Sequence, residues 1–133
     1  MSLERHHRYG PGELIVHDGD CGDRFFLIES GSVQVFKRTA TGHKIVIGKI
    51  KTGGIFGEMA VIDGHARMAS VVALEPTVCR IFAPELLNLK IAESDPMVRT
   101  VIGLFMEHIR ALTAAQIQYE VVGETPDLLP RVI

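Results

Sequence analysis

The chain has 133 residues, of which 47% are hydrophobic and 23% charged, and its formal net charge is -2 with histidine neutral. This length suits one domain with one core, and the composition excludes an intrinsically disordered chain. No apolar run approaches the roughly 20 residues that span a bilayer, and no stretch is basic enough to attract nucleic acid, so neither a membrane span nor direct nucleic-acid binding is expected.

Short apolar runs separated by glycines fill the first two thirds of the chain. We expect strands at Glu13 to His17, Arg24 to Glu29, Ser32 to Arg38, Lys44 to Lys51, Ala69 to Leu74 and Val78 to Phe82. Ser30-Gly31 joins the second and third runs and predicts a hairpin. In the fourth run, Ile45, Ile47 and Lys49 are expected on one side of the strand. This spacing indicates an antiparallel sandwich or barrel rather than a parallel sheet.

The last third of the chain changes to helical periodicity. Pro84 predicts a short helix through Ile91, and Asp95-Pro96 predicts the start of a longer helix that ends near Tyr119. The apolar residues of the longer helix recur at helical spacing, and we expect them to pack against the barrel as one stripe: Val98, Val101, Ile102, Phe105, Ile109 and Leu112. We expect one domain over residues 9–120 and a C-terminal tail or linker over residues 121–133.

The segment from Phe56 to Val71 carries the residues that indicate chemistry. Glu58 to Ile62 is long enough for one helical turn, whose start presents free backbone N–H groups to an anion. Gly57 lets a ligand approach the backbone closely, and Arg67 can meet a phosphate with two parallel hydrogen bonds. A sugar hydroxyl is a suitable donor for the Glu58 carboxylate, which Arg67 can also orient and neutralise. The segment therefore suits a sugar phosphate.

This segment resembles the phosphate-binding cassette of the cyclic nucleotide-binding domain family, which includes the catabolite activator protein, regulatory subunits of cAMP-dependent kinase and cyclic-nucleotide-gated channels. The similarity extends from about Tyr9 to about Leu112. Its other carriers are the runs Gly10 to Ile15, Gly19-Asp20 with Asp23, Phe26 to Ile28 and Gly31 to Val33. The resemblance implies a mainly β fold, an antiparallel β-roll (a jelly-roll-like double-stranded β-helix) with a short phosphate-cassette helix and C-terminal helices.

The resemblance also implies roles for individual residues. Glu58 matches the glutamate that accepts a hydrogen bond from the ribose 2′-hydroxyl, and Arg67 matches the arginine that pairs with the cyclic phosphate. Met68 is expected to offer its backbone N–H to the phosphate. Neighbouring positions line the sugar phosphate or begin the strand behind it, so the expected ligand-binding residues are Gly57, Glu58, Met59, Ala60, Arg67, Met68 and Ala69.

The function that the resemblance implies is a non-catalytic regulatory domain that binds a cyclic purine nucleotide and signals through movement of its C-terminal helix. We expect cAMP rather than cGMP as the regulatory ligand, because family members that prefer cGMP tend to carry threonine where this chain has Met68. An effector domain or protein would be contacted through the C-terminal helices, and a homodimer is compatible with this. Two other positions depart from the family: Ala66 replaces a common proline, and the usual preceding helix is nearly absent before Tyr9.

Other interpretations stay open. Glu58 and Arg67 could form a plain ion pair that holds a turn, or the pocket could be vestigial in a fold-conserved interaction module. An activator-type transcription regulator would need a helix-turn-helix, and too little chain follows Leu112 to build one. The chain could therefore be only the sensor half of such a regulator. A cupin-like metal site would need two histidines separated by one residue, which none of the six histidines provides.

Several remaining side chains are expected to be structural or solvated. Arg110 and Gln116 could cap a nucleotide base, but we expect solvent around each of them. Cys21 and Cys79 have no metal-type spacing, and Cys79 is expected to be a buried small hydrophobe. No serine or cysteine is paired with histidine as a nucleophile, and no set of metal ligands is present in the sequence. Neither catalysis nor a bound metal is therefore expected. The start of the chain lacks the apolar core of a signal peptide, which predicts a cytoplasmic location.

Overall fold

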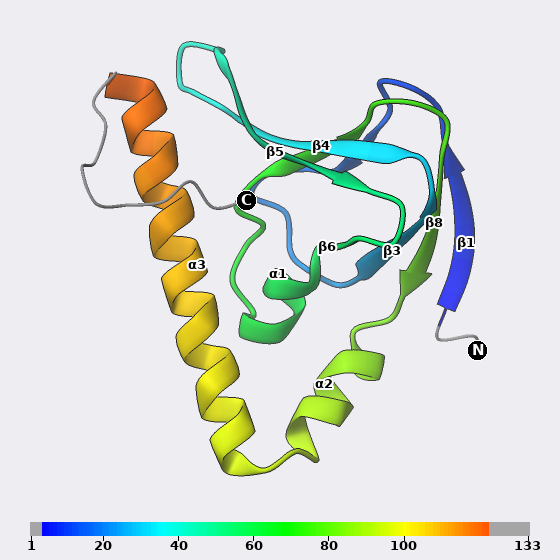
Figure 1. Ribbon diagram of the computed structural model, residues 1–133, viewed down its shortest axis with the longest axis vertical. Coiled ribbons are helices and arrows are strands. Elements are labelled where there is room, and N and C mark those ends of the chain that lie inside the picture. Colours follow the sequence, from blue (N-terminus) through cyan, green and yellow to red (C-terminus); the bar gives the residue numbers. More distant parts are fainter. Residues whose placement is uncertain (1–3, 123–133) are drawn as a thin grey trace.

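The computed structural model describes residues 4–122, with side chains as far as residue 118. It has two four-stranded antiparallel sheets, one short helix between the strands and two helices after them (Figure 1). The strands are β1 (Glu4–Tyr9), β2 (Leu14–Val16), β3 (Phe25–Ser30), β4 (Ser32–Arg38), β5 (Lys44–Lys51), β6 (Ile55–Phe56), β7 (Ser70–Ala73) and β8 (Thr77–Phe82). The helices are α1 (Glu58–Asp63), α2 (Glu85–Ala92) and α3 (Pro96–Val122). The expected mainly β class, with a short helix in the cassette and helices after the strands, is confirmed.

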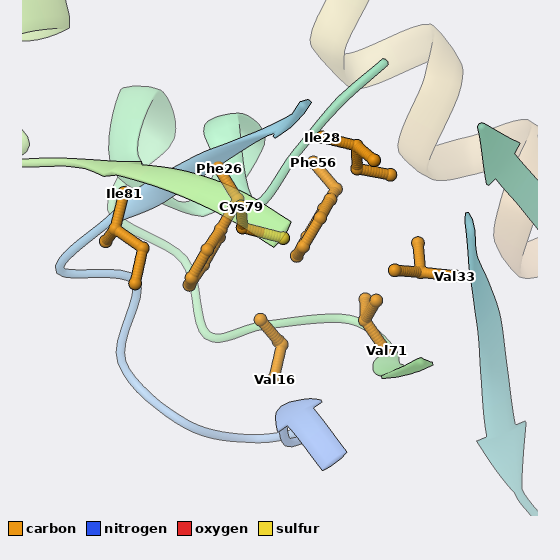
Figure 2. Packing of buried hydrophobic residues seen from close by; sticks show 8 residues of the cluster. All are labelled: Val16, Phe26, Ile28, Val33, Phe56, Val71, Cys79 and Ile81. Atoms are coloured by element: carbon orange, nitrogen blue, oxygen red, sulfur yellow. The ribbon is translucent and has the colours of Figure 1, made fainter. Parts of the chain in front are cut away.

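The core lies between the two sheets, whose strand orders are β1-β8-β3-β6 and β2-β7-β4-β5. Figure 2 shows side chains from both sheets meeting there, and the buried cluster consists of Val16, Phe26, Ile28, Val33, Phe56, Val71, Cys79 and Ile81. The rings of Phe26 and Phe56 stack with their centroids 4.7 Å apart. Cys79 is fully buried, as expected, and burial raises the pKa of its thiol to about 11. Both sheets thus contribute side chains to one apolar core.

The expected hairpin between β3 and β4 is wrong. β3 pairs with β8 and β6, whereas β4 pairs with β5 and β7 in the other sheet. The turn at Gly31, with φ of +104°, carries the chain from one sheet to the other. A Cβ at Gly31 would lie 2.5 Å from Oγ1 of Thr77, so the crossing brings the two sheets together more closely than a side chain allows. A turn signal identifies such a reversal but does not reveal which strand becomes the neighbour.

β5 has the expected bounds but not the expected face at its end. Ile45 and Ile47 are buried, whereas Lys49 is exposed and Ile50 packs against the core. The register with β4 shifts between Val35, which pairs with Gly48, and Phe36, which pairs with Val46. This irregularity leaves one extra residue on β5 and reverses the alternation of its side chains. The simple two-residue period therefore fails beyond Ile47.

β1 is an element that the sequence analysis did not include. Its six residues, ERHHRY, pair with β8 over their whole length, from Glu4 opposite Phe82 to Tyr9 opposite Thr77. All of them except Tyr9 are exposed, so the strand has no apolar face that periodicity could reveal. Polar and charged side chains suit an edge strand because they discourage pairing with further strands.

The predicted apolar stripe of α3 is buried only in part: Ile102, Ile109 and Leu112 are partly buried, whereas its other three members are not. Val98, Val101 and Phe105 are exposed, Phe105 by 61%, whereas Met106, Thr113 and Gln116 are buried. Only the later part of α3 runs beside the barrel and α1, as Figure 1 shows, which agrees with the exposure of Val98 and Val101 in its first turns. Helical periodicity identified the helix but not the face that meets the barrel.

The described helices include none that is both long and apolar enough to cross a membrane. α3 begins where expected, with the backbone N–H of Met97 donating to the Asp95 carboxylate at 2.8 Å. The segment expected as a tail, residues 121–133, lies outside the described residues from residue 123 onward.

Candidate ligand-binding site

A cavity of about 350 Å³ opens at the end of the barrel where α1 begins. This volume falls in the range of roughly 300–1,000 Å³ that small-molecule sites occupy. All seven residues expected from the sequence line it: Gly57, Glu58, Met59, Ala60, Arg67, Met68 and Ala69. The remaining walls come from apolar side chains of the barrel and from three residues of α3. The structure thus brings the predicted residues together around one space, and their roles toward a ligand stay a prediction.

Arg67 is the most buried charged group of the cavity, with 8% of its surface exposed. Its Nη1 donates to the carbonyl of Gly57 at 3.1 Å and its Nη2 to the carbonyl of Arg24 at 2.7 Å. Its backbone is fixed as well, because Arg67 N donates to Asp20 and Arg67 O accepts from Gly19, both at 2.8 Å. A guanidinium has more N–H donors than these bonds use, so Arg67 is a rigidly held cation with donors left for an anion.

Carboxylates near Arg67 partly offset the cost of burying it. Burial lowers the pKa of the Arg67 guanidinium, and the charges of Asp23, Asp20 and Glu58 oppose that shift. Because an arginine stays protonated even with a lowered pKa, the group keeps its positive charge in the cavity. An anionic ligand would therefore meet a cation that has already lost most of its water.

Gly57 is required by the geometry around this cation. It caps the start of α1 with φ of +83°, a left-handed conformation that side chains disfavour. A Cβ at Gly57 would lie 2.8 Å from Nη1 of Arg67 and 3.2 Å from the Phe26 ring. A second glycine, Gly22, has the same kind of role, because its Cβ would lie 2.3 Å from that of Ala60 in α1. These close approaches pack α1 against the loop of residues 19–24, whose backbone also forms hydrogen bonds with Arg67.

Glu58 shares the cavity with Arg67 but does not pair with it. Desolvation raises the pKa of the Glu58 carboxyl, while the helix backbone and the charge of Arg67 act in the opposite direction without cancelling the shift. The ion pairs found among residues 4–118 do not include Glu58 with Arg67. Arg67 therefore does not neutralise Glu58 through direct contact, which corrects the expectation from the sequence and leaves the plain ion pair without support. Among the described residues, no side chain pairs with the Glu58 carboxylate, which leaves it able to accept a hydrogen bond from a further donor.

α3 closes one side of the cavity with residues that the sequence analysis did not assign to it. Ile109, Arg110 and Thr113 line the cavity, and Gln116 is buried one turn further along. Arg110 grips the last residue of α1, donating to the Asp63 carboxylate from Nε at 2.5 Å and from Nη2 at 3.0 Å. The expectation that Arg110 and Gln116 are solvated is therefore wrong. The spacing of Ile109, Arg110 and Thr113 on one helical face was the available signal.

The Asp63–Arg110 pair is partly buried, with about a fifth of each side chain exposed (19% and 20%). Burial alone would raise the pKa of the Asp63 carboxyl, but the hydrogen bonds and charge of Arg110, together with the N–H of His65, outweigh it and lower the pKa. The carboxylate is thus ionised and accepts three hydrogen bonds, two from Arg110 and one from the backbone N–H of His65. This pair links α1, which follows Gly57, to α3.

In the part of the chain that is described, no group of three or more His, Cys, Asp and Glu side chains is placed to hold a metal ion. The cavity offers one buried cation, one carboxylate and apolar walls. These groups suit a ligand with an anionic part, a hydroxyl and an apolar ring.

Comparison with known proteins agrees with this chemistry. The family model described as "Cyclic nucleotide-binding domain" matches residues 6–93. A cAMP-dependent protein kinase regulatory subunit of Hypocrea atroviridis is 41% identical over 66 residues, which are 50% of this chain and 13% of that protein. Acetyltransferase Pat of Mycolicibacterium smegmatis is 44% identical over 68 residues, which are 51% of this chain and 20% of that protein.

Solved structures of the EAL enzyme Bd1971 have the same fold. Its cAMP-bound form superposes with a TM-score of 0.77 at 25% identity, over 89% of this chain and 32% of that one. Its cGMP-bound form gives 0.76 at 28% identity, over 80% and 28%. The chain thus spans between an eighth and a third of the length of these relatives, which include a kinase subunit, an acetyltransferase and an EAL enzyme. The chain belongs to the cyclic nucleotide-binding domain family.

Proposed function

We propose that the cavity binds a cyclic purine nucleotide, with cAMP preferred over cGMP, and that the domain acts as a non-catalytic regulator. The observation that carries this proposal is the buried Arg67 guanidinium, held by two carbonyls and facing the same cavity as the unpaired Glu58 carboxylate. A cyclic phosphate supplies the anion for Arg67, and a ribose 2′-hydroxyl supplies the donor for Glu58. In the same assignment, the backbone at Gly57, Met59, Ala60, Met68 and Ala69 lies along the sugar phosphate.

The apolar part of the cavity suits a purine base. Val35, Ile47 and Ile50 from the barrel and Ile109 from α3 offer flat contact area to a ring system. Met68 has no hydroxyl to meet the guanine amino group, which supports a preference for adenine. The EAL enzyme has been solved with cAMP and with cGMP, so relatives accommodate both bases. The preference in this chain rests on the side chain at position 68.

We assign transmission of the signal to α3, through its contact with α1. A ligand shifts a helix only if it binds one arrangement more tightly than the other. Ile109, Arg110 and Thr113 line the cavity, and the Asp63–Arg110 pair holds α3 against the helix whose first residues lie along the ligand. Occupancy that stabilises α1 in its place would therefore also stabilise the docked position of α3.

The effector of this signal would dock on α2 and α3. Exposed large apolar side chains gather on these helices: Leu89, Met97, Val98, Val101, Leu104 and Phe105. Such a surface supports contact with an effector domain, an effector protein or a second copy of the chain. The kinase subunit, the acetyltransferase and the EAL enzyme illustrate that domains of this family occur within larger proteins of different activity.

The proposal is tested by replacing the cation. Arg67→Ala removes hydrogen bonds to a charged group that contribute about 1.5–3 kcal/mol, so calorimetry should show cAMP affinity lowered roughly tenfold to a hundredfold or more. Arg80→Ala is the matched control. Arg80 forms an ion pair with Glu29 at 2.8 Å and does not line the cavity. Equal affinity of folded Arg67→Ala and wild-type protein would refute the assignment. It would leave the exposed face of α2 and α3 as the functional surface of an interaction module with a vestigial pocket.

A further inference from the structure

A second cavity, of about 560 Å³, lies on the outer face of the sheet β2-β7-β4-β5. Its lining residues are Gly12, Leu14, His17, Asp18, Phe36, Arg38, Lys44, Ser70 and Val72, none of which lines the first cavity. The two cavities lie on opposite sides of β7, because side chains alternate along a strand: Val71 faces the first cavity, and Ser70 and Val72 face the second. The volume is in the range of small-ligand sites.

The floor of this second cavity is apolar and aromatic. Phe36 is only 7% exposed although it points away from the core, and it pairs with Ser70 across the sheet. Leu14, which pairs with Val72, extends the floor and is 45% exposed. Because Phe36 is itself nearly covered, the contact area open to a flat apolar ligand comes mainly from Leu14 and Val72.

The rim of the cavity is cationic. Nζ of Lys44 lies 4.7 Å and Cζ of Arg38 5.6 Å from the centroid of the Phe36 ring. Within residues 4–118, no carboxylate forms an ion pair with either group. The carboxylate among the lining residues, Asp18, is engaged by Lys37 at 3.0 Å. Two positive charges therefore stand over the aromatic floor without a neutralising partner.

Ser70 adds a directed hydrogen-bond donor at the edge of the floor. It is 6% exposed, and its hydroxyl oxygen accepts from the backbone N–H of Asp18 at 2.9 Å. A hydroxyl has one proton to donate, which this bond does not use. We propose that the cavity is a second ligand site, for a small organic anion with a planar apolar ring. The anionic group would lie at Lys44 and Arg38, and the ring would cover Leu14 and Val72.

The test is an NMR titration of the full ¹⁵N-labelled chain with 2-naphthoate, which has the proposed ring and charge. Saturable shifts of the backbone amides of Leu14, Phe36, Ser70 and Val72 are expected. Lys44→Gln should weaken the apparent affinity roughly fivefold, the factor for about 1 kcal/mol lost with a charge-assisted contact. Arg38→Gln should behave in the same way. The neutral ring 2-naphthalenemethanol should bind the wild-type protein more weakly than 2-naphthoate.

Lys51→Gln is the control, because Lys51 lies on the same strand as Lys44, is exposed and does not line the cavity. Its affinity should equal that of the wild-type protein. The proposal is overturned if the shifts fall only on residues of the first cavity or of α3, or if Lys44→Gln and Arg38→Gln bind 2-naphthoate as the wild type does. It is equally overturned if Lys51→Gln loses as much affinity as they do. Should a variant fail to fold, equal binding of the two ligands to the wild-type chain would still contradict it.

Discussion

Glu58 is a carboxylate placed where the empty protein disfavours its charge. The seven expected ligand-binding residues, Glu58 among them, were predictable from the sequence. They lie in two short segments, residues 57–60 and 67–69, and both segments line the same cavity. The sequence did not reveal that the Arg67 side chain would lie apart from the Glu58 carboxylate. The Arg67 guanidinium donates to the carbonyls of Gly57 and Arg24 instead of pairing with Glu58. Arg24 is distant from Arg67 in the sequence, so no local motif indicates this contact.

The first prediction concerns the stability of the empty protein. Burial raises the pKa of Glu58 above its ordinary value of 4.5, so the folded state is penalised once the carboxyl ionises. Glu58→Gln should therefore raise the Tm near neutral pH, because the amide carries no charge that burial could disfavour. The gain should disappear as the pH falls below 4.5, where the carboxyl is protonated in both states. Thermal unfolding followed by circular dichroism measures it.

Glu58→Gln should have the opposite effect on binding. An amide oxygen accepts a weaker hydrogen bond than a carboxylate, so cAMP affinity should fall roughly fivefold, while the affinity for 2′-deoxy-cAMP changes little. A variant that is less stable than the wild type near neutral pH, or that loses equal affinity for both nucleotides, would contradict the role given to Glu58.

Met68 is the residue to which we attribute base choice. Met68→Thr places a hydroxyl where it can meet the guanine amino group, and a neutral hydrogen bond of about 0.5–1.5 kcal/mol should raise the ratio of cGMP to cAMP affinity roughly twofold to tenfold. Competition against a fluorescent cAMP analogue measures the ratio. A wild-type protein that already prefers cGMP would contradict the base assignment.

Among the elements, the pairing of α1 with α3 was the least accessible from the sequence. The strands and helices follow from apolar periodicity and from glycine and proline positions, yet the neighbours of β3 and β4 and the inward face of α3 depend on packing across the whole barrel. The bulge in β5 and the all-polar β1 show the same limit. Ile109, Arg110 and Thr113 reach the cavity only because of the direction in which α3 runs.

The Asp63–Arg110 pair should couple these two helices. Asp63→Asn and Arg110→Gln should each weaken cAMP binding several-fold, because either change frees α3 from the cavity wall. The double variant should be no weaker than the single ones, with a coupling free energy of roughly 0.5–3 kcal/mol, as expected for residues in direct contact. Calorimetry on all four proteins gives the cycle.

Hydrogen exchange gives a second readout of the same coupling. Saturating cAMP should slow exchange in residues 105–118 of the wild type and much less so in Arg110→Gln. Glu107→Gln is the control, since Glu107 is exposed on the same helix and does not line the cavity. Additive losses in the double variant, together with unchanged protection of α3 in Arg110→Gln, would exclude the pair as the link.

For the whole molecule, the fold class and family were predictable because the cassette is a contiguous motif, whereas the surfaces that connect the domain to others were not. Val98, Val101 and Phe105, in the first turns of α3, were predicted as part of a core stripe, and the structure leaves them exposed. The barrel, the cavity and α3 together form a unit whose binding properties can be measured on this chain. The claim that joins them is that the cavity takes a cyclic purine nucleotide.

The most direct test of that claim is isothermal titration of the wild-type chain with cAMP, after unfolding and refolding through dialysis to remove any nucleotide that co-purified. We predict saturable binding of one cAMP per chain, competed by cGMP with lower affinity and not by the linear 5′-AMP at similar concentration. The absence of a saturable heat of binding in protein shown by circular dichroism to have refolded would contradict the account.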